Sequence, residues 1–253
     1  MDRNDDIGAR ALAVRHAAHA AVCDVLEPWA HGAVARATRY PHYWDFNVVR
    51  VEDDPAMDVD SLAAFAEQAL AGLDHRRIDF DLMAAADPLR ADFEAKGWHT
   101  MRLLWMLHDG SPLEAPAISV EEVPYDAVHN LRVAGHLEDF PDQRDSSYHA
   151  QAREVAMALG VQVLAIREGS ESVAFAQLQR AGGTAEISEV YVLPDYRGSG
   201  RGTAMTAAAI RAAGTAGDLW ICADDEDRPK ELYARLGFRP AWTTMEFTLR
   251  PRG

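Results

Sequence analysis

The sequence predicts an α/β (α+β) protein made of two tandem units. Three observations lead to this prediction. Strand and helix patterns alternate in the same order in both halves, residues 78–82 and 93–98 align with 218–222 and 233–238 at the same offset of 140, and a segment rich in glycine and proline separates the halves. An internal duplication explains these regularities. The alternative is two unrelated α/β segments whose turn residues happen to fall at matching positions.

Hydrophobic periodicity and turn residues define the elements of each half. In the first half they predict strands at 43–51, 76–84 and 99–107 and helices at 58–72 and 87–97. In the second half they predict a strand near 116–123, helices at 125–140 and 147–160, paired strands at 161–168 and 171–180, a strand at 184–194, a helix at 202–214, a strand at 218–224, a helix at 227–237 and a strand at 241–250.

The segment 108–126 is the predicted boundary between the halves. It contains Gly110, Pro112, Pro116 and Pro124, which interrupt regular structure. A chain of 253 residues is long enough for two small folding units. We therefore expect one domain at 1–112 and a second at 113–253.

Composition limits the classes of function. Asp and Glu number 40 against 25 Lys and Arg, and the resulting net charge of −15 predicts no nucleic-acid partner because it repels a phosphate backbone. No apolar run approaches the roughly 18 residues that span a bilayer, and the N-terminus has no apolar signal region, so we expect a cytoplasmic protein with no membrane partner. Cys23 and Cys222 lack CxxC spacing, and His16 and His19 lack a third ligand, so we expect neither a disulfide framework nor a metal site.

The stretch VYVLPDYRGSGRGTAM, residues 190–205, joins a predicted strand to a predicted helix. Glycine has no Cβ and accepts positive φ, so the three glycines here can turn several main-chain N–H groups toward one point. The helix start adds unpaired amides and its dipole, and two arginines add positive charge. Hydrogen bonds to a charged group contribute about 1.5–3 kcal/mol each, so three or four amides can hold a diphosphate. The absence of Lys-Ser/Thr after the last glycine argues against a nucleotide-hydrolase P-loop.

Together with ELYARLGF at 231–238, this stretch resembles the GCN5-related N-acetyltransferase (GNAT) superfamily, whose Arg/Gln-x-x-Gly-x-Gly/Ala loop binds the pyrophosphate of acetyl-CoA. The resemblance covers about residues 117–250. It implies two tandem GNAT-like units, each a mixed, mostly antiparallel sheet flanked by helices, with acetyl-CoA or another acyl-CoA as co-substrate. The residues that it implies in cofactor binding are Val190, Tyr191 and Val192 on the strand and Arg197, Gly198, Ser199, Gly200, Arg201, Gly202 and Thr203 in the loop and helix start.

Tyr233 lies in the second motif and is the catalytic acid that the resemblance implies. Acyl transfer from a thioester expels a thiolate whose pKa is about 8.5, and a phenol of pKa about 10 held at the sulfur can protonate it. A tyrosine that only fills the core is the alternative interpretation. The chain departs from the family pattern at Glu226, where many members have an asparagine that contacts the cofactor.

The amine nucleophile must also lose a proton, because an alkyl amine of pKa near 10.4 is neutral only about one time in 10³ at pH 7. Glu186 and Glu189 on the 184–194 strand are the candidate bases. Strict alternation puts Glu189 on one face with Ile187 and Tyr191, and Glu186 on the other with Ser188, unless a bulge intervenes. We favour Glu189 as the base, with ordered water as the alternative proton path.

The first half lacks both features of the predicted site. An offset of 140 residues from the phosphate loop leads to RVEDDPAMDVDS at 50–61, which has no glycine and five acidic residues. The same offset puts Phe93 where the second half has Tyr233. We therefore expect the first half to be a degenerate, non-catalytic copy of the fold.

The acceptor is predicted to lie near HLEDFPDQRDSSYH at 136–149, because this segment commonly walls the acceptor pocket in GNAT proteins. Glu138 and Asp139 are candidate ligands for a cationic amine, and solvated acidic residues are the alternative. The leading hypothesis is an acyl-CoA-dependent N-acetyltransferase acting on a primary amine of a small molecule, as a monomer or homodimer. The alternatives are a protein N-acetyltransferase, a carrier-protein-dependent acyltransferase and a non-catalytic CoA-sensing module.

Overall fold

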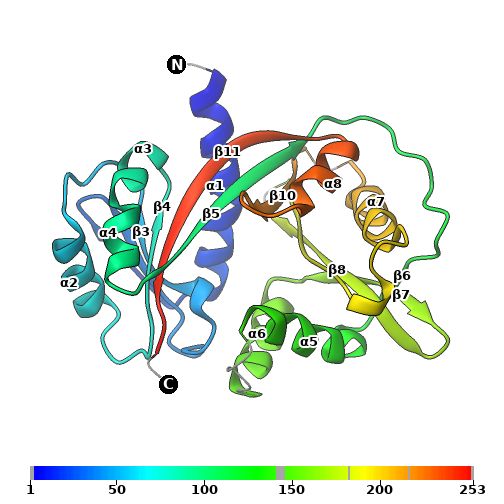
Figure 1. Cartoon of the computed structure of the whole chain (residues 1–253), viewed down its shortest axis with the longest axis horizontal. Helices are drawn as coiled ribbons and strands as arrows, with labels where there is room; N and C mark the ends of the chain where they lie inside the picture. The colour runs from blue at the N-terminus through cyan, green and yellow to red at the C-terminus, as the bar shows by residue number, and fades with distance from the viewer. Residues whose placement is uncertain (1–2, 141–145, 182, 216, 252–253) are drawn as a thin grey trace. The chain divides into compact units, whose positions relative to one another are not determined.

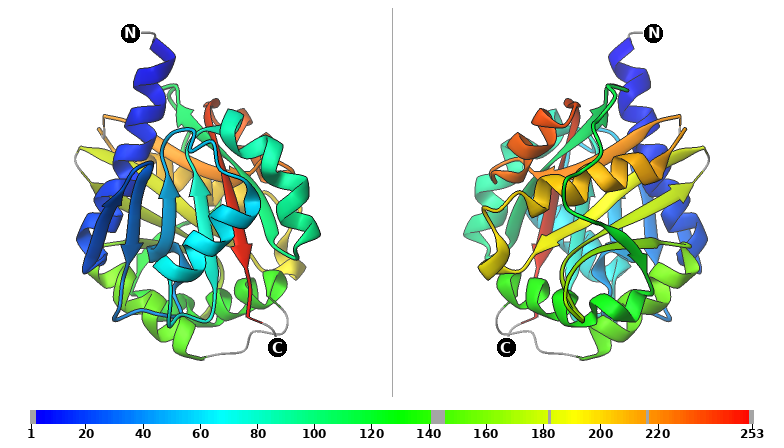
Figure 2. Two further views of the ribbon diagram at one scale, coloured as in Figure 1. Left: turned by 90° about the vertical axis from the view of Figure 1, so that its left-hand side faces the viewer. Right: turned by 90° about the vertical axis from the view of Figure 1, so that its right-hand side faces the viewer.

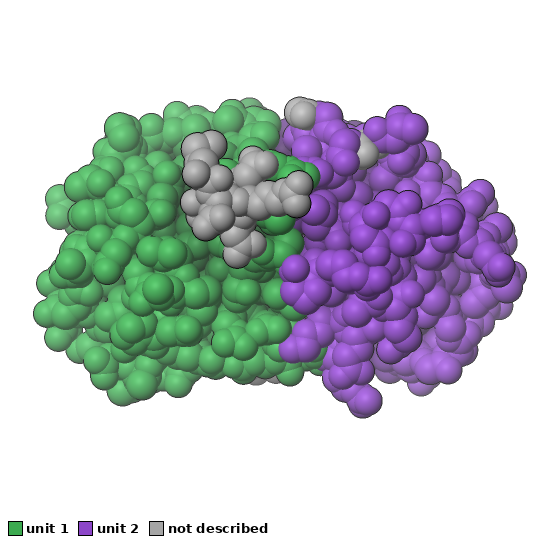
Figure 3. Space-filling model, turned by 90° about the horizontal axis from the view of Figure 1, so that it is seen from above, with its two compact units in different colours: residues 1–105, 223–227, 241–253 green, residues 106–222, 228–240 purple. Residues whose placement is uncertain are grey.

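The structure, a computed structural model, describes residues 3–140, 146–181, 183–215 and 217–251. The chain forms two compact units, which Figure 3 shows in different colours. Unit 1 consists of residues 1–105, 223–227 and 241–253, and unit 2 consists of residues 106–222 and 228–240. These units differ from a simple division at residue 112, because two later segments of the chain belong to unit 1.

Unit 1 is a mixed sheet with helices on both faces (Figure 1). Its strands are ordered β1-β2-β3-β4-β11-β5, with β1–β2, β2–β3 and β4–β11 antiparallel and β3–β4 parallel. The elements are α1 (Arg3–Val22), β1 (Val25–Trp29), β2 (Gly32–Arg36), β3 (Asn47–Val51), α2 (Val59–Ala69), β4 (Arg76–Phe80), α3 (Met83–Ala86), α4 (Arg90–Ala95), β5 (His99–His108) and β11 (Phe238–Leu249).

Alternation along β4 separates the two faces of the unit 1 sheet. Ile78 and Phe80 are fully buried in an apolar cluster with residues of α2, α3 and α4, which lie in front of the strands in the left view of Figure 2. Arg77 and Asp79 point to the other face, where Asp79 forms an ion pair with Arg15 of α1. Helix α1 contributes to unit 1 both this ion pair and the buried apolar residues Ala11, Val14 and Ala18.

Unit 2 repeats this pattern of pairing. Its strands are ordered β10-β9-β8-β7-β6, with β6–β7, β7–β8 and β8–β9 antiparallel and β9–β10 parallel. The elements are β6 (Glu121–Val123), α5 (His129–Asp139), α6 (Ser146–Ala158), β7 (Gln162–Glu168), β8 (Glu171–Ala181), β9 (Thr184–Val192), α7 (Arg201–Ala213), β10 (Leu219–Asp224) and α8 (Pro229–Arg235).

The two faces of the unit 2 sheet are covered by different helices. Phe175 of β8 lies in an apolar cluster with Val128 and Leu131, at the start of α5. Arg180 of the same strand points the opposite way and donates to the Ala212 carbonyl near the end of α7, at 2.5 Å. Helix α7 crosses that second face in the right view of Figure 2.

The predicted fold class is confirmed, since each unit is a mixed, mostly antiparallel sheet flanked by helices. The last strand, β11, forms an antiparallel pair with β4, with Met245 opposite Phe80 and Leu249 opposite Arg76. A strand of the second half thus joins the unit 1 sheet. None of the helices in the described part of the chain combines the length and apolar character needed to cross a membrane.

Candidate functional site

The parallel pair β9–β10 opens at its carboxyl end. The strands pair from Ala185 opposite Leu219 to Ile187 opposite Ile221, and no further pairs follow among the described residues. Strand β9 nevertheless continues to Val192. Main-chain groups on the β10 side of this last stretch of β9 therefore face a gap between diverging strands, where an extended ligand can pair with them.

A β-bulge lies in the same stretch of β9. Between the pairs that Ser188 and Tyr191 form with β8, two residues of β9 oppose one residue of β8. One of the two is Glu189, whose φ of 54° lies in the left-handed region. Such a conformation is uncommon for a residue other than glycine and is typical of bulges that redirect side chains.

Because of the bulge, both candidate bases lie on the α5 side of the sheet. Glu186 is opposite Gln179, which alternation puts on the same face of β8 as Phe175. Glu189 reaches Arg132 of α5, with 3.1 Å between its carboxylate and the guanidinium. The strict alternation predicted from the sequence, with the two carboxylates on opposite faces, is therefore wrong.

The loop after β9 presents unpaired main-chain amides. Within the part of the chain that the structure describes, the N–H groups of residues 198–203 have no hydrogen-bond acceptor, and the first bond of α7 runs from Ala204 N–H to the Gly200 carbonyl. Gly198 and Gly200 have φ of 73° and 82°, and a Cβ at either position would meet no atom within 4 Å. The loop thus combines left-handed glycines, open space and a helix N-terminus, the combination that binds anions.

The side chain of Arg197 is held away from these amides by the protein itself. It donates to both carboxylate oxygens of Glu138 on α5, at 2.9 and 2.7 Å, and to the Val192 carbonyl at 2.8 Å. The Tyr191 hydroxyl donates to the same carboxylate at 2.6 Å. Partial burial and the bond to Glu138 raise the pKa of Tyr191 to about 12. Partial burial acts to raise the pKa of Glu138, but the bonds from Tyr191 and Arg197 outweigh it, so that pKa lies below its ordinary value.

Arg201, the second arginine of the loop, lies at the start of α7. It forms an ion pair with Glu168 of β7 and donates to the Ser199 hydroxyl at 2.6 Å. Its guanidinium also stacks over the Tyr196 ring, 5.0 Å from the centroid. These contacts fix the shape of the loop, so that the open main-chain amides, more than the arginine side chains, are what the loop offers to a ligand.

Tyr233 is buried in α8, 7% exposed, with its ring against Phe238 at 6.3 Å. The helix lies close to the loop, because a Cβ on Gly202 would meet Leu232 at 3.4 Å and Val192 at 3.9 Å. The loop, the end of β9 and the helix that carries Tyr233 therefore meet at one place in unit 2.

The corresponding corner of unit 1 is closed. Strands β3 and β4 stay paired to their last residues, Val51 opposite Phe80, and no bulge or gap separates them. Asp58 caps α2 by accepting from the Ser61 amide at 2.9 Å, so the protein's own carboxylate occupies the position of an anion. Phe93 is fully buried and stacks on Phe247, with centroids 4.2 Å apart.

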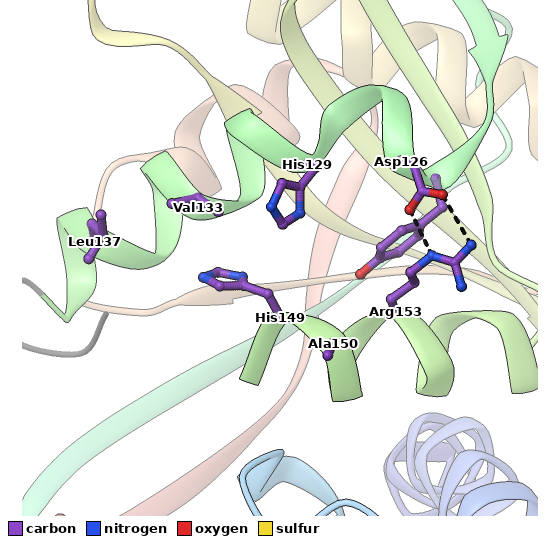
Figure 4. A pocket seen from close by; sticks show the side chains of 8 residues that line it. Asp126, His129, Val133, Leu137, His149, Ala150 and Arg153 are labelled. Carbon is purple, nitrogen blue, oxygen red and sulfur yellow. Dashed lines mark hydrogen bonds and ion pairs between the residues drawn. The ribbon is translucent and has the colours of Figure 1, made fainter. Parts of the chain in front are cut away.

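A pocket of about 460 Å³ lies between α5 and α6. Figure 4 shows His129 and His149 pointing toward one another across it, next to the ion pair of Asp126 with Arg153, whose atoms are 2.7 and 3.0 Å apart. Tyr125 also lines the pocket, and Val133, Leu137 and Ala150 are apolar members of the lining. Burial raises the pKa of Tyr125 to about 12.

The side chain of Arg132 connects this pocket to β9. The guanidinium of Arg132, which pairs with Glu189, lies over the Tyr125 ring at 4.8 Å from its centroid. Tyr125 in turn lines the pocket. A ligand there would lie on the same face of the sheet as the two candidate bases.

Of the two acidic residues proposed to bind the acceptor, Glu138 and Asp139, the structure describes the side chain of Glu138 only. Glu138 is engaged by Arg197 and Tyr191, a network that joins residues more than 50 positions apart and that no local motif reveals. The side chain of Asp139 lies outside the described residues. Glu226 is in unit 1, where it accepts from Arg90 at 2.7 Å.

Comparisons with known proteins agree with this geometry. Residues 160–240 match the family model described as "Acetyltransferase (GNAT) domain". None of the curated proteins compared with the chain matches it.

Solved structures resemble the chain over most of its length. A functionally unknown conserved protein from Staphylococcus epidermidis is 14% identical, with 91% of this chain and 95% of that chain covered and a TM-score of 0.66. A GCN5-related N-acetyltransferase from Kribbella flavida is 20% identical, with coverage of 100% and 97% and a TM-score of 0.62. One from Sphaerobacter thermophilus is 13% identical, with coverage of 88% and 78% and a TM-score of 0.52. At these identities the likeness shows the fold, and the chain has a GNAT-like fold with a GNAT domain match in its second half.

Proposed function

We propose that this chain is an N-acetyltransferase that transfers an acyl group, most simply acetyl, from acyl-CoA to a primary amine of a small molecule. The observation that carries the proposal is the set of open amides at 198–203, next to a gap between β9 and β10. The family match over 160–240 supports it, since it includes the loop, both strands and α8.

Acetyl-CoA fits this site by its chemistry. Its diphosphate needs several donors converging on one point, which the amides of Gly198 through Thr203 supply together with the dipole of α7. Its pantetheine arm carries amides that can pair with the main chain of Val190 to Val192 in the manner of an added strand. The thioester then lies along the gap toward α8.

The acyl transfer is a direct attack. The neutral amine attacks the thioester carbonyl carbon, the C–N bond forms, the C–S bond breaks, and the thiolate takes a proton from the Tyr233 hydroxyl. Tyr233 then recovers a proton from solvent. The position of its helix favours this role, because a Cβ on Gly202 of the loop would meet the side chain of the neighbouring Leu232 at 3.4 Å.

The acceptor amine must also lose a proton. Glu189 is our candidate for the base, acting directly or through water, with Glu186 on the same face as the alternative. One oxygen of Glu189 accepts from Arg132, which leaves its other oxygen for the amine or a water.

The pocket between α5 and α6 is our candidate for the acceptor site. Its volume of about 460 Å³ suits a small molecule, and its apolar walls with a few polar groups are typical of small-ligand sites. Asp126 is neutralised by Arg153, so selection of a cation by charge at that residue is weak. We propose that unit 1 is a non-catalytic copy, because its parallel strands stay paired and Asp58 caps its helix.

The test is release of free CoA thiol from acetyl-CoA with a panel of small primary amines. We expect amine-dependent release by the wild-type chain and a kcat at least tenfold lower for Tyr233→Phe, with Kd for CoA changed less than twofold. Tyr40→Phe is the matched control, since Tyr40 is a tyrosine of unit 1 that is also 7% exposed.

The alternatives give different results in the same assay. A CoA-sensing module binds CoA and releases no thiol with any amine. A protein acetyltransferase releases thiol with peptides and not with small amines, and a carrier-protein-dependent enzyme is inactive with acetyl-CoA. Equal kcat for the wild type and Tyr233→Phe would refute the assignment of the acid.

A further inference from the structure

Three potential metal ligands meet in unit 1, far along the chain from the loop after β9 that we propose for the acyl donor. His16 comes from α1, Glu52 follows the last residue of β3, and Asp81 follows the last residue of β4. One ligand atom of each lies within 4.8 Å of the others. The carboxyl ends of two neighbouring parallel strands and one helix thus converge on a single point.

Two of the three ligand groups carry buried atoms that lack a partner. Among the described residues, Asp81 Oδ2 and His16 Nε2 are buried and make no hydrogen bond. Asp81 is only 5% exposed, so solvent does not satisfy its carboxylate. Leaving a buried carboxylate oxygen and an imidazole nitrogen without partners costs folding free energy, and a ligand that binds both at once removes this cost.

The spacing fits a metal ion after a small contraction. Donors at the corners of a triangle with sides of 4.8 Å lie about 2.8 Å from its centre, and Zn–N and Zn–O bonds are about 2.0–2.2 Å. His16 Nε2 and Glu52 Oε1 are already closer, at 3.9 Å. Shifts of about 0.7 Å or less per side chain therefore complete the coordination. The side chains of His16 and Glu52 are 33% and 37% exposed, which leaves an entry path for the ion.

The surroundings decide which ligand the cluster prefers. Arg50 pairs with one oxygen of Glu52, and Arg15 is engaged by Asp79 and lies 3.9 Å from Glu246. Arg15 is therefore paired with carboxylates outside the cluster, whereas Arg50 pairs with Glu52 itself, so that a metal ion would share this carboxylate with Arg50. One imidazole with two carboxylates favours a first-row transition ion such as Zn²⁺ over Mg²⁺, which prefers oxygen ligands alone.

We propose that His16, Glu52 and Asp81 form a binding site for a divalent transition-metal ion, represented by Zn²⁺. In the sequence, His16 and His19 have no third ligand, which led us to expect no metal. In the fold, His19 turns away and its Nε2 lies 2.9 Å from the Asp45 carbonyl, while the ends of β3 and β4 bring two carboxylates to His16. The metal fastens α1 to the ends of the parallel strands and has a structural role.

The experiment is calorimetric titration of Zn²⁺ into the full-length chain after removal of metals with a chelator. The variants are Asp81→Asn and His16→Gln, which keep size and remove one ligand each. His31→Gln is the matched control, because His31 forms an exposed pair with Asp53 outside the cluster, at 2.7 Å. Circular dichroism checks folding, and Co²⁺ absorption in the visible range reports coordination independently of any enzyme activity.

We expect one Zn²⁺ per chain, at least tenfold weaker binding in Asp81→Asn and in His16→Gln, and unchanged binding in His31→Gln. The Co²⁺ bands disappear in both cluster variants, and Zn²⁺ raises the Tm of the wild type and not that of Asp81→Asn. If Asp81→Asn does not fold, His16→Gln alone decides. No Zn²⁺ binding by the wild type, or affinity retained in the cluster variants, would overturn the proposal.

Discussion

Substituting Gly200 with alanine separates the two roles of the phosphate loop, its shape and its binding of the ligand. Gly200 caps α7 with φ of 82° and ψ of −1°. An alanine in this left-handed conformation costs about 1 kcal/mol relative to glycine. The added Cβ meets no atom within 4 Å, so the free protein has no steric cost to add. For a chain of this size, the expected fall in Tm is about 2–4 °C.

The effect on CoA binding should be much larger. A methyl group or a small rotation of the 200–201 peptide that removes one amide from the diphosphate loses a hydrogen bond to a charged group, about 1.5–3 kcal/mol. This corresponds to about ten- to a hundredfold weaker binding. The assay is calorimetric titration of CoA, with Tm measured on the same preparations.

Gly160→Ala provides the matched control. Gly160 also lies in unit 2, has φ of 64° after α6, and has no atom within 4 Å of an added Cβ. It should lose the same few degrees of Tm and keep wild-type CoA affinity. Equal CoA affinity of Gly200→Ala and Gly160→Ala would refute the assignment of the loop as the diphosphate site.

Three further predictions concern charge, pH and stoichiometry. Glu138→Gln should bind CoA about two- to fivefold more tightly, because the substitution removes a carboxylate near the loop and releases Arg197. A raised KM for the amine with unchanged CoA affinity would instead identify Glu138 as a ligand of the acceptor. The pKa of His75 lies below 6.5 because burial disfavours its charged form, so below that pH the unfolded chain binds a proton that the native chain excludes. The contribution of this group to the free energy of unfolding should be constant above pH 6.5 and should fall below it, by up to about 1.4 kcal/mol per pH unit. His75→Asn should therefore flatten a plot of Tm against pH between 7 and 5. Calorimetry should give one CoA per chain, because β3 and β4 stay paired and Asp58 caps α2; two equivalents would contradict a non-catalytic unit 1.

Local features of the fold were predictable because local residues determine them. The glycines of the loop, the alanine-rich α7 and the apolar β9 and β10 carry their own signals of turn, helix and strand. The amides of residues 198–203 follow from this local pattern alone. Helix α1 was not predicted, although Ala11, Val14 and Ala18 are buried at helical spacing, because small residues interrupted by Arg15 and His19 leave its hydrophobic periodicity weak. The hairpin of β1 and β2 was missed because its strands are short and β1 contains Pro28.

Features that depend on distant partners were not predictable. Nothing local in residues 241–249 indicates that they pair with β4, because strand partners are chosen by the whole fold. The bulge at Glu189 puts this residue on the same face of β9 as Glu186. The two-residue period that assigns the faces from sequence assumes a strand without a bulge. The pairing of Glu138 with Arg197 and the meeting of His16 with Asp81 likewise need tertiary structure before they can be seen.

A crystal structure of the chain with bound acetyl-CoA tests the central claim most directly. We expect one ligand per chain, with its diphosphate oxygens within hydrogen-bond distance of the main-chain nitrogens of residues 198–203 and its sulfur beside the Tyr233 hydroxyl. A ligand bound in unit 1, or a diphosphate held elsewhere while those nitrogens stay open, would contradict it.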